Sequence, residues 1–248
     1  MTHARTRRPG RIAALVPFVA IAALALAACS AAATTAPSSV PTMPPVTPAP
    51  SVSAAPAGSA AAVASPDLSK CPKAATDIVP LKAGETKTVT IETTAGTIVT
   101  QVSGDLAPIA AGNFVDLAQC GYFDGVVFHR TVPGFVIQGG DGQFGRAPIA
   151  SPDHMGRGGP GYTFNDEPVV GEYVRGALAM ANAGANTNGS QFFIMLADTP
   201  AMPKDYTIFG KVTQGMDVVD AIAAAPQSGS PDNIPNDPVV MTKVTVSN

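Results

Sequence analysis

The sequence predicts a mainly β fold, in which an antiparallel sheet closes on itself and carries two α-helices. Three observations predict it. Many short segments have the apolar or alternating pattern of strands, two longer segments have helical periodicity, and glycine-rich stretches connect them. Short strands with such connections are typical of closed antiparallel sheets.

The predicted strands begin with a hairpin. Val89 and Ile91 alternate with polar residues over 87–93, Ala95-Gly96 provides a turn, and a second strand follows over 97–102. All of the strands lie after residue 66, which suits a single domain over residues 67–248. The later strands are expected at 126–130, 135–138, 177–180, 191–195, 206–212 and 239–246.

Two segments have the period of an amphipathic helix. The first begins at Pro108 and ends at Gly121, a residue type that suits the end of a helix. The second covers about 216–225, with Pro226 as its stop. In the first helix one face carries Phe114, Leu117 and Ala118.

The N-terminus has the pattern of an export signal. Four arginines within the first eleven residues precede an apolar run over 12–28, which ends in Leu-Ala-Ala-Cys. This ending resembles the lipobox of bacterial lipoproteins, in which the thiol of the cysteine accepts a diacylglycerol. We therefore expect a signal peptide over 1–28, lipidation of Cys29, and a protein anchored outside the cytoplasm to the bacterial cell membrane. An ordinary cleaved signal peptide and an uncleaved anchor are the alternatives.

The segment over 29–66 is predicted to be a disordered tether that follows the lipidated cysteine. It consists mostly of Ala, Pro, Ser, Thr and Val, and the first acidic residue of the chain, Asp67, comes directly after it. Such a composition does not bury enough apolar surface to offset the entropy of ordering the chain. The tether would hold the domain away from the membrane.

Charge excludes one class of partner. Of the 15 basic residues, four lie in the signal, which leaves 11 basic and 18 acidic residues after residue 66. A domain this acidic, without a cluster of Lys or Arg, is a poor ligand for phosphate backbones, so no nucleic acid is expected. The few histidines predict no metal site, and nothing indicates more than a monomer.

Cysteine usage agrees with an oxidising compartment. With Cys29 used for the lipid, Cys71 and Cys120 remain as an even pair. We predict a disulfide between them that holds the start of the domain to the first helix. The alternative is two independent thiols.

Four separated segments resemble, in order, the signature segments of the cyclophilins. They are FHRTVPGFVIQGGD (128–141), GRGGPGYTFNDE (156–167), MANAGANTNGSQFF (180–193) and YTIFGKV (206–212). The resemblance implies a closed eight-stranded antiparallel β-barrel capped by two helices. It also implies peptidyl-prolyl cis–trans isomerase activity on X–Pro bonds, without a cofactor. Proline-containing polypeptides would be the substrates.

The resemblance assigns roles to individual positions. Arg130 matches the catalytic arginine, and Tyr206 and Val136 stand where His and Met are common in the family. Family members often carry Trp where this chain has Ala201, and the loop over 142–155 is longer than usual. The substrate-binding positions that match are Phe135, Val136, Gln138, Gly156, Ala181, Asn182, Ala183, Gln191, Phe193, Met202 and Tyr206.

The residue types themselves favour binding over bond cleavage. One cation, several amides and several apolar side chains occur together without a nucleophile, which suits the stabilisation of a peptide conformation. The leading hypothesis is an isomerase that assists the folding of exported proteins. A peptide-binding module of the cell surface with little turnover, and a purely structural surface protein, are the alternatives.

Overall fold

The computed structural model describes residues 66–227 and 233–248. The predicted signal peptide over 1–28, the lipidation site Cys29 and the tether up to residue 65 lie outside the described residues. In the described part of the chain, no helix is both long and apolar enough to cross a membrane.

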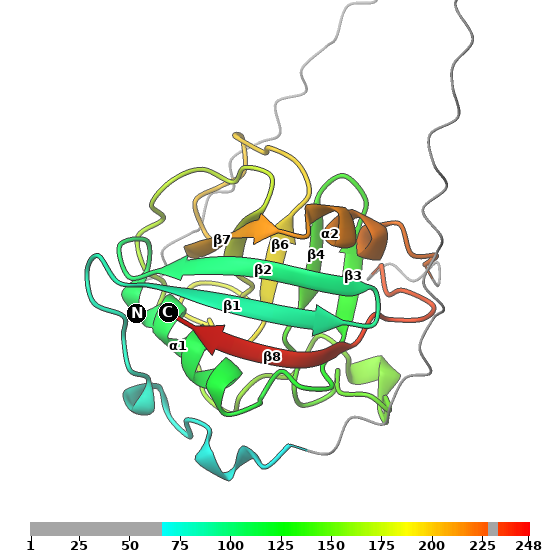
Figure 1. Cartoon of the computed structure of the whole chain (residues 1–248), viewed down its shortest axis with the longest axis horizontal. Helices are drawn as coiled ribbons and strands as arrows, with labels where there is room; N and C mark the ends of the chain where they lie inside the picture. Colours follow the sequence, from blue (N-terminus) through cyan, green and yellow to red (C-terminus); the bar gives the residue numbers. More distant parts are fainter. Residues whose placement is uncertain (1–65, 228–232) are drawn as a thin grey trace, which may run out of the picture. The chain divides into compact units, whose positions relative to one another are not determined.

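Eight strands form one curled antiparallel sheet in the order β3-β4-β6-β5-β7-β2-β1-β8 (Figure 1). Its end strands are linked only by short irregular pairing, in which Val127 bridges Val240 and the N–H of Phe128 donates to the carbonyl of Val239. The predicted mainly β, antiparallel fold is confirmed. The strands are β1 Thr86–Thr93, β2 Gly96–Ser103, β3 Phe128–Val132, β4 Val136–Gly139, β5 Ala177–Met180, β6 Phe192–Met195, β7 Ile208–Gln214 and β8 Met241–Ser247.

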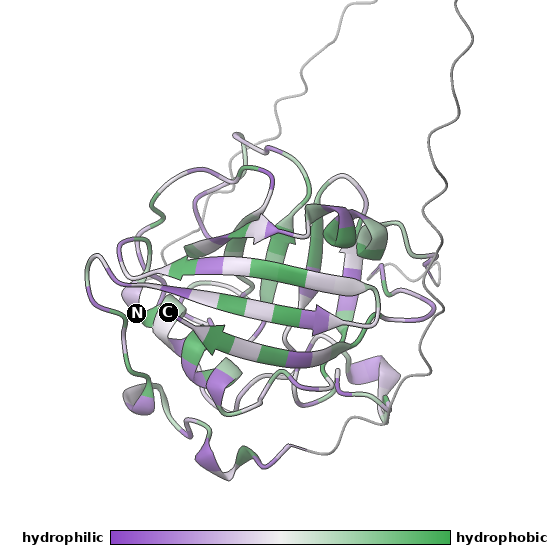
Figure 2. Ribbon diagram, viewed as in Figure 1, coloured by the Kyte–Doolittle hydropathy of each residue, from purple (hydrophilic) through white to green (hydrophobic). Residues whose placement is uncertain are grey.

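The predicted first hairpin is confirmed by the pairing of β1 with β2. Ile91 lies opposite Ile98, and Val89 lies opposite Thr100, whose hydroxyl donates to the Val89 carbonyl at 3.1 Å. These four side chains are buried, while their neighbours along each strand point to solvent. Figure 2 shows the resulting alternation of hydropathy along the strands. The period of two in the sequence therefore sets the register.

One predicted strand begins in the wrong place. A continuous strand over 126–130 was expected, but β3 begins only at Phe128. Val126 bridges Arg146 and Val127 bridges Val240, so these two residues pair with segments outside β4. The register also shifts between Phe128 and Arg130, within the pairing of β3 with β4. The apolar run in the sequence does not reveal this change of partners.

Two helices cover the sheet, as predicted. α1 (Pro108–Gln119) contacts β8, β7, β1 and β2, and α2 (Met216–Ala223) contacts β2, β3 and β4. α1 has proline at its start and Gly121 at a φ of 77° just beyond its end, where a left-handed conformation favours glycine. α2 ends two residues earlier than expected.

The sheet carries apolar side chains on both faces. Along β4, Ile137 points into a larger cluster that also contains Phe114 of α1 and Val219 of α2. Its neighbour Val136 points to the opposite face, into a smaller cluster with Phe193 of β6. Since successive residues of a strand point to opposite faces, β4, β5 and β6 contribute to both clusters. The larger one is the domain core, and the smaller one lies beside the candidate site.

The disulfide between Cys71 and Cys120 is confirmed. It joins the segment before β1, which includes the 3-10 turns η1 (Leu68–Lys70) and η2 (Ala75–Asp77), to the end of α1. Further along the segment, the N–H of Val79 donates to the carboxylate of Asp116 on α1 at 2.8 Å. The first residues of the domain are therefore held along this helix at two points.

Candidate active site

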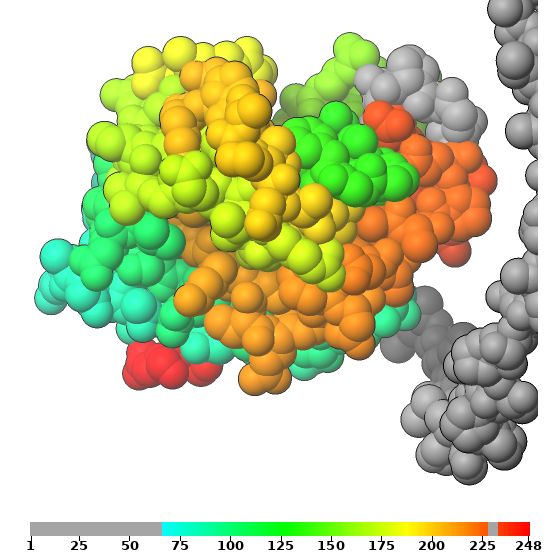
Figure 3. All heavy atoms as spheres, turned by 90° about the horizontal axis from the view of Figure 1, so that it is seen from above, coloured from blue at the N-terminus to red at the C-terminus, as the bar shows by residue number. Residues whose placement is uncertain are grey.

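Four neighbouring strands place one row of side chains on the same face of the sheet. Arg130 on β3 is paired with Gln138 on β4, Gln138 with Phe193 on β6, and Phe193 with Ala179 on β5. Directly paired residues of antiparallel strands share a face. The row therefore passes from a cation through an amide to an aromatic ring. In Figure 3 the turn between β3 and β4, in bright green, is exposed at the surface.

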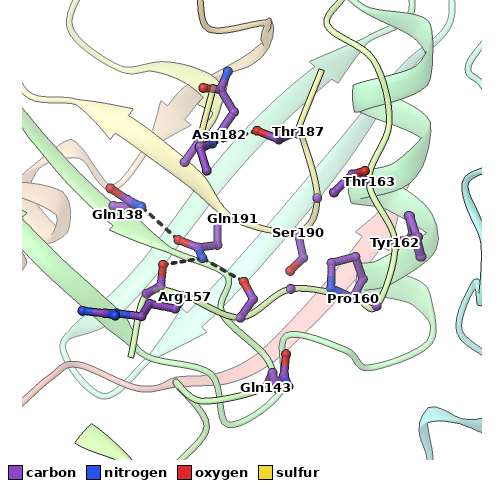
Figure 4. Close-up of a pocket in the computed structure, with 17 residues that line it drawn as sticks. Gln138, Gln143, Arg157, Pro160, Tyr162, Thr163, Asn182, Thr187, Ser190 and Gln191 are labelled. Carbon is purple, nitrogen blue, oxygen red and sulfur yellow. Dashed lines mark hydrogen bonds between the residues drawn. The ribbon is translucent and has the colours of Figure 1, made fainter. Parts of the chain in front are cut away.

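A chain of hydrogen bonds joins the polar groups of this row. Arg130 Nη1 donates to Gln138 Oε1 at 3.3 Å, and Gln138 Nε2 donates to Gln191 Oε1 at 2.9 Å. Gln191 Nε2 in turn donates to the carbonyls of Gly156 at 2.9 Å and Gly158 at 2.8 Å (Figure 4). The structure thus brings together four residues predicted from widely separated segments, and it orients the guanidinium of Arg130.

The predicted apolar wall is assembled next to this chain. Val136 and Phe193 are buried in the smaller apolar cluster, and the rings of Phe193 and Tyr206 meet edge to face at 5.6 Å. Four of the predicted members are half-buried and leave part of their surface accessible: Phe135, Ala181, Met202 and Tyr206. The predicted residues that pack in or against this cluster are Phe135, Val136, Ala181, Phe193, Met202 and Tyr206.

Tyr173 supports this wall and was not foreseen from the sequence. Its side chain is 1% exposed, and its hydroxyl donates to the carbonyl of Tyr206 at 2.9 Å while accepting from the Tyr206 N–H at 3.0 Å. Burial raises the pKa of the Tyr173 phenol. The two bonds fix the backbone of Tyr206 and hence its ring. A lone tyrosine between charged and apolar residues carries no periodic signal that would have identified this role.

The segment after β5 presents free main-chain groups. Asn182 Nδ2 donates to the carbonyl of Asp205 at 2.9 Å, which ties this segment to the loop that carries Tyr206, and the N–H of Ala183 donates to Thr187 Oγ1 at 2.8 Å. No group in the described part of the chain bonds the main-chain N–H or carbonyl of Asn182. They are available to pair with an extended peptide.

Two hollows lie on the polar side of the row. The larger, of about 770 Å³, is lined in part by Gln138, Gly156 and Gln191 and by the predicted segment 181–183. The smaller, of about 150 Å³, is lined by His129, Arg130, Gln138, Met155, Gly156, Arg157 and Ile234. The predicted site residues therefore divide in two: the polar ones line hollows, and the large apolar ones form the wall beside them.

Asp141 holds the loop that borders both hollows. Its carboxylate is fully buried, and Oδ2 accepts from the N–H groups of Gly156 at 2.8 Å and Gly158 at 3.0 Å. Oδ1 accepts from the N–H groups of Gln143 at 3.1 Å and Phe144 at 2.8 Å. Sequence reasoning gave Asp141 no role, although an aspartate directly after Gly139-Gly140 is a residue type suited to bonding loop amides.

His129 and Gly156 contact each other, and both line the smaller hollow together with Arg130. A Cβ on Gly156 would lie 3.1 Å from His129 Cδ2, and the φ of Gly156 is 84°, so both contact and conformation favour glycine there. His129 is 3% exposed, and neither ring nitrogen has a partner among the described residues. Burial lowers its pKa to about 4, with Arg130 adding to the effect and Asp141 opposing it. The ring is therefore neutral at pH 7.

Comparison with known proteins agrees with this geometry. Residues 88–246 match the family described as cyclophilin type peptidyl-prolyl cis-trans isomerase/CLD. A peptidyl-prolyl cis-trans isomerase A of Mycobacterium tuberculosis is 41% identical over 181 residues, which are 65% of this chain and 93% of that protein.

Solved structures show the same fold. The crystal structure of a cyclophilin type peptidyl-prolyl cis-trans isomerase of Cryptosporidium parvum has a TM-score of 0.57 and 31% identity, over 66% of this chain and 99% of that one. A second structure of that protein, determined in the presence of the dipeptide Ala-Pro, has a TM-score of 0.56 and 32% identity, over 65% of this chain and 99% of that one. With its fold, its matched length and its polar row beside an apolar wall, the chain belongs to the cyclophilin-type peptidyl-prolyl cis–trans isomerases.

Proposed function

We propose that this isomerase acts on X–Pro bonds of exported proteins and assists their folding outside the cytoplasm, held at the membrane by a lipid on Cys29. The N-terminal arginines, the apolar run and the Leu-Ala-Ala-Cys ending support the export and the anchor. The Cys71–Cys120 disulfide agrees with an oxidising compartment.

We assign catalysis to Arg130. Rotation about an X–Pro bond crosses a barrier of ~18–20 kcal/mol because the C–N bond has partial double-bond character. In the twisted state the resonance is broken and the proline nitrogen carries a lone pair. A guanidinium N–H that donates to this lone pair stabilises the twisted state more than either planar state, which is the condition for catalysis. Arg130 is half-buried and oriented by Gln138, so it is prepared for this role.

The groups on either side of Arg130 would hold the two ends of the rotating bond. The proline ring would pack on the apolar wall at Phe135, Phe193 and Met202, where desolvation favours it. Residue X would pair with the free main-chain groups of Asn182. The Ala-Pro dipeptide used with the related Cryptosporidium protein has the chemistry expected of such a ligand. The observation that carries the proposal is the bonded row from Arg130 to Gln191 beside this wall.

Proline-limited refolding of a test protein checks the assignment. The domain over 66–248 should accelerate the slow phase, and Arg130→Ala should lower this acceleration by about 10²-fold, as found when an oriented donor to a transition state is removed. Arg130→Lys keeps the charge without the planar fork and should retain only part of the activity. Lys211→Ala removes an exposed cation elsewhere on the domain and should leave the rate unchanged. Equal acceleration by the Arg130→Ala domain would refute the role of Arg130.

Fractionation of cells that express the full chain tests the anchor. We expect the wild-type protein in the membrane fraction, with a lipid label that depends on Cys29. Cys29→Ala should abolish the label and remove the protein from that fraction. An unchanged distribution and label in the variant would contradict the lipoprotein proposal.

A further inference from the structure

Arg157 occupies a fixed position between the two hollows. The glycines on either side of it are held twice. Asp141 accepts from the N–H groups of Gly156 and Gly158, and Gln191 donates to the carbonyls of the same two residues. The main chain before and after Arg157 is therefore held by hydrogen bonds to both Asp141 and Gln191. The Cα of Arg157, from which its side chain extends, therefore has a fixed position.

The guanidinium of Arg157 is not engaged by the protein. The residue is exposed, and no described residue accepts a hydrogen bond from its side chain or forms an ion pair with it. Figure 4 shows the side chain extending toward the side of Gln138, away from Pro160 and Tyr162. Arg157 lines both the hollow of about 770 Å³ and the smaller one that Arg130 also lines.

The charge around these hollows is unbalanced. Arg157 is the only charged residue that lines the larger hollow, and Arg130 joins it in the smaller one; none of the described lining residues is acidic. The nearby carboxylate of Asp141 is fully buried and already accepts four backbone N–H groups.

Several cations elsewhere on the described surface form ion pairs, although Lys70, Lys82 and Lys211 form none. Arg175 lies 2.7 Å from Asp220, Lys204 lies 2.8 Å from Glu172, and Lys243 lies 2.7 Å from Asp124. What distinguishes Arg157 is its place: it lines both hollows, and no described acidic residue lines either of them, although the domain as a whole is acidic. A ligand that brings a carboxylate would supply the negative charge.

We propose that Arg157 makes this isomerase select polypeptides with Asp or Glu at X or in the two residues before it. The inference rests on the proposed placement of the X–Pro bond. With the proline ring on the apolar wall, the chain on the other side of the rotating bond passes Gln138 and Asn182 and enters the region of the hollows. A carboxylate there meets the guanidinium of Arg157, which is planar and always charged and can donate two parallel hydrogen bonds to the two carboxylate oxygens. A Lys or Arg side chain of the substrate at the same place would be repelled by the positive charges of Arg157 and Arg130.

Exchange between cis and trans isomers of short peptides, measured by NMR, tests the inference. The peptides carry neutral acyl and amide ends, and Glu, Gln or Lys stands in turn at X and at each of the two positions before it. For the wild-type domain, kcat/KM should follow the order Glu, Gln, Lys at one or more of these positions. The Glu to Gln ratio should be about two- to fivefold at low salt, the effect of an exposed ion pair, and should shrink in concentrated salt.

Variants assign the selectivity to one residue. Arg157→Gln should bring the Glu to Gln ratio close to one, Arg157→Lys should keep part of it, and Arg157→Glu should reverse the order in favour of Lys. Lys211→Gln removes the same charge elsewhere and should keep the wild-type ratio. Equal turnover of the Glu and Gln peptides by the wild-type domain would overturn the inference, as would an unchanged ratio in Arg157→Gln.

Failure of the proposed function looks different from failure of this inference. If no peptide is turned over faster than in buffer, the catalytic assignment fails. The selectivity is then read from the dissociation constants of the same Glu and Gln peptides, obtained by chemical-shift titration. Tighter binding of Glu peptides that is lost in Arg157→Gln would support the inference, and equal binding would refute it.

Discussion

His129 and Asp141 show how burial determines the behaviour of individual residues near Arg130. Asp141 is buried as a carboxylate because four backbone N–H groups solvate it. His129 has no such partners among the described residues, and its ring is neutral because desolvation lowers its pKa to about 4. Two buried polar side chains in the same region therefore differ in their partners: Asp141 is bonded by backbone N–H groups, and His129 is desolvated without a partner among the described residues.

His129 predicts a dependence of stability on acid. Its folded-state pKa of about 4 is lower than the usual histidine value of 6.5, so between these values the unfolded chain binds a proton that the folded domain does not. The contribution of neutral His129 to the free energy of unfolding is fully present above pH 6.5, and it is lost as the pH falls toward 4. Between pH 7 and pH 5 the free energy of unfolding should fall by about 2 kcal/mol from this residue alone.

Urea denaturation at both pH values, on the wild type and on two histidine variants, measures this contribution. Between pH 7 and pH 5, the free energy of unfolding of the His129→Gln variant should fall by about 2 kcal/mol less than that of the wild type. His154→Gln is the matched control, because His154 is exposed, and its loss should equal that of the wild type. An equal loss in all three proteins would show that His129 is not held neutral.

The helices and strands are completed by residues far away in the sequence. α1 begins after Ala107, which has no side chain able to cap a helix. Glu167 performs this function from another segment: its carboxylate accepts from the N–H groups of Ile109 at 2.9 Å and Ala110 at 2.8 Å. A negative charge at this end also interacts favourably with the helix dipole. The start of α1 thus depends on where residue 167 is placed.

Removal of this cap should destabilise the domain. Glu167→Ala leaves two N–H groups without acceptors, and we expect the free energy of unfolding to fall by about 1–2 kcal/mol, measured in urea at pH 7. Glu172→Ala is the control, since Glu172 forms an exposed ion pair with Lys204 and should cost less than about 1 kcal/mol. Equal effects of the two substitutions would contradict the capping role.

Across the described domain, one covalent link and one curled sheet bring distant parts of the sequence together. The disulfide closes a loop of 49 residues between the first described segment and the end of α1. The sheet then places β1 beside β8, so residues from both ends of the domain are neighbours. The site on β3, β4 and β6 lies apart from the disulfide, because neither cysteine lines the two hollows.

The disulfide should matter for stability and not for turnover. Replacing Cys71 and Cys120 by serine together should lower the free energy of unfolding by about 2–4 kcal/mol, because the unfolded chain gains the freedom that the closed loop removed. The rate of X–Pro isomerisation by the folded protein should stay as in the wild type. Reduction of the wild type should reproduce the loss of stability, while the same reductant should leave the serine variant unchanged. If the double-serine variant were as stable as the wild type, the structural role of the disulfide would be refuted.

The elements with a clear period were predictable, and those that change partners were not. β5 lies where its apolar run predicted it, because a short buried strand has the same neighbours along its length. The segment over 126–130 divides its pairing among three partners, which local pattern does not encode. Within the site, Arg130, Gln138 and Phe193 were identified from their motifs. Arg157 and Tyr173 were missed, because their roles depend on contacts with distant loops.

The sequence by itself determined the fold class, the family, the pairing of Cys71 with Cys120 and most of the candidate site. Periodicity and motif order survive in a linear chain, so these features were readable. Tertiary structure alone decided that Gln138 and Gln191 form one bonded row, and that Asp141 holds the loop carrying Arg157. It also decided that this cation stands without a partner among the described residues. These are relations between side chains from different segments, and they exist only once the sheet has brought those segments into contact.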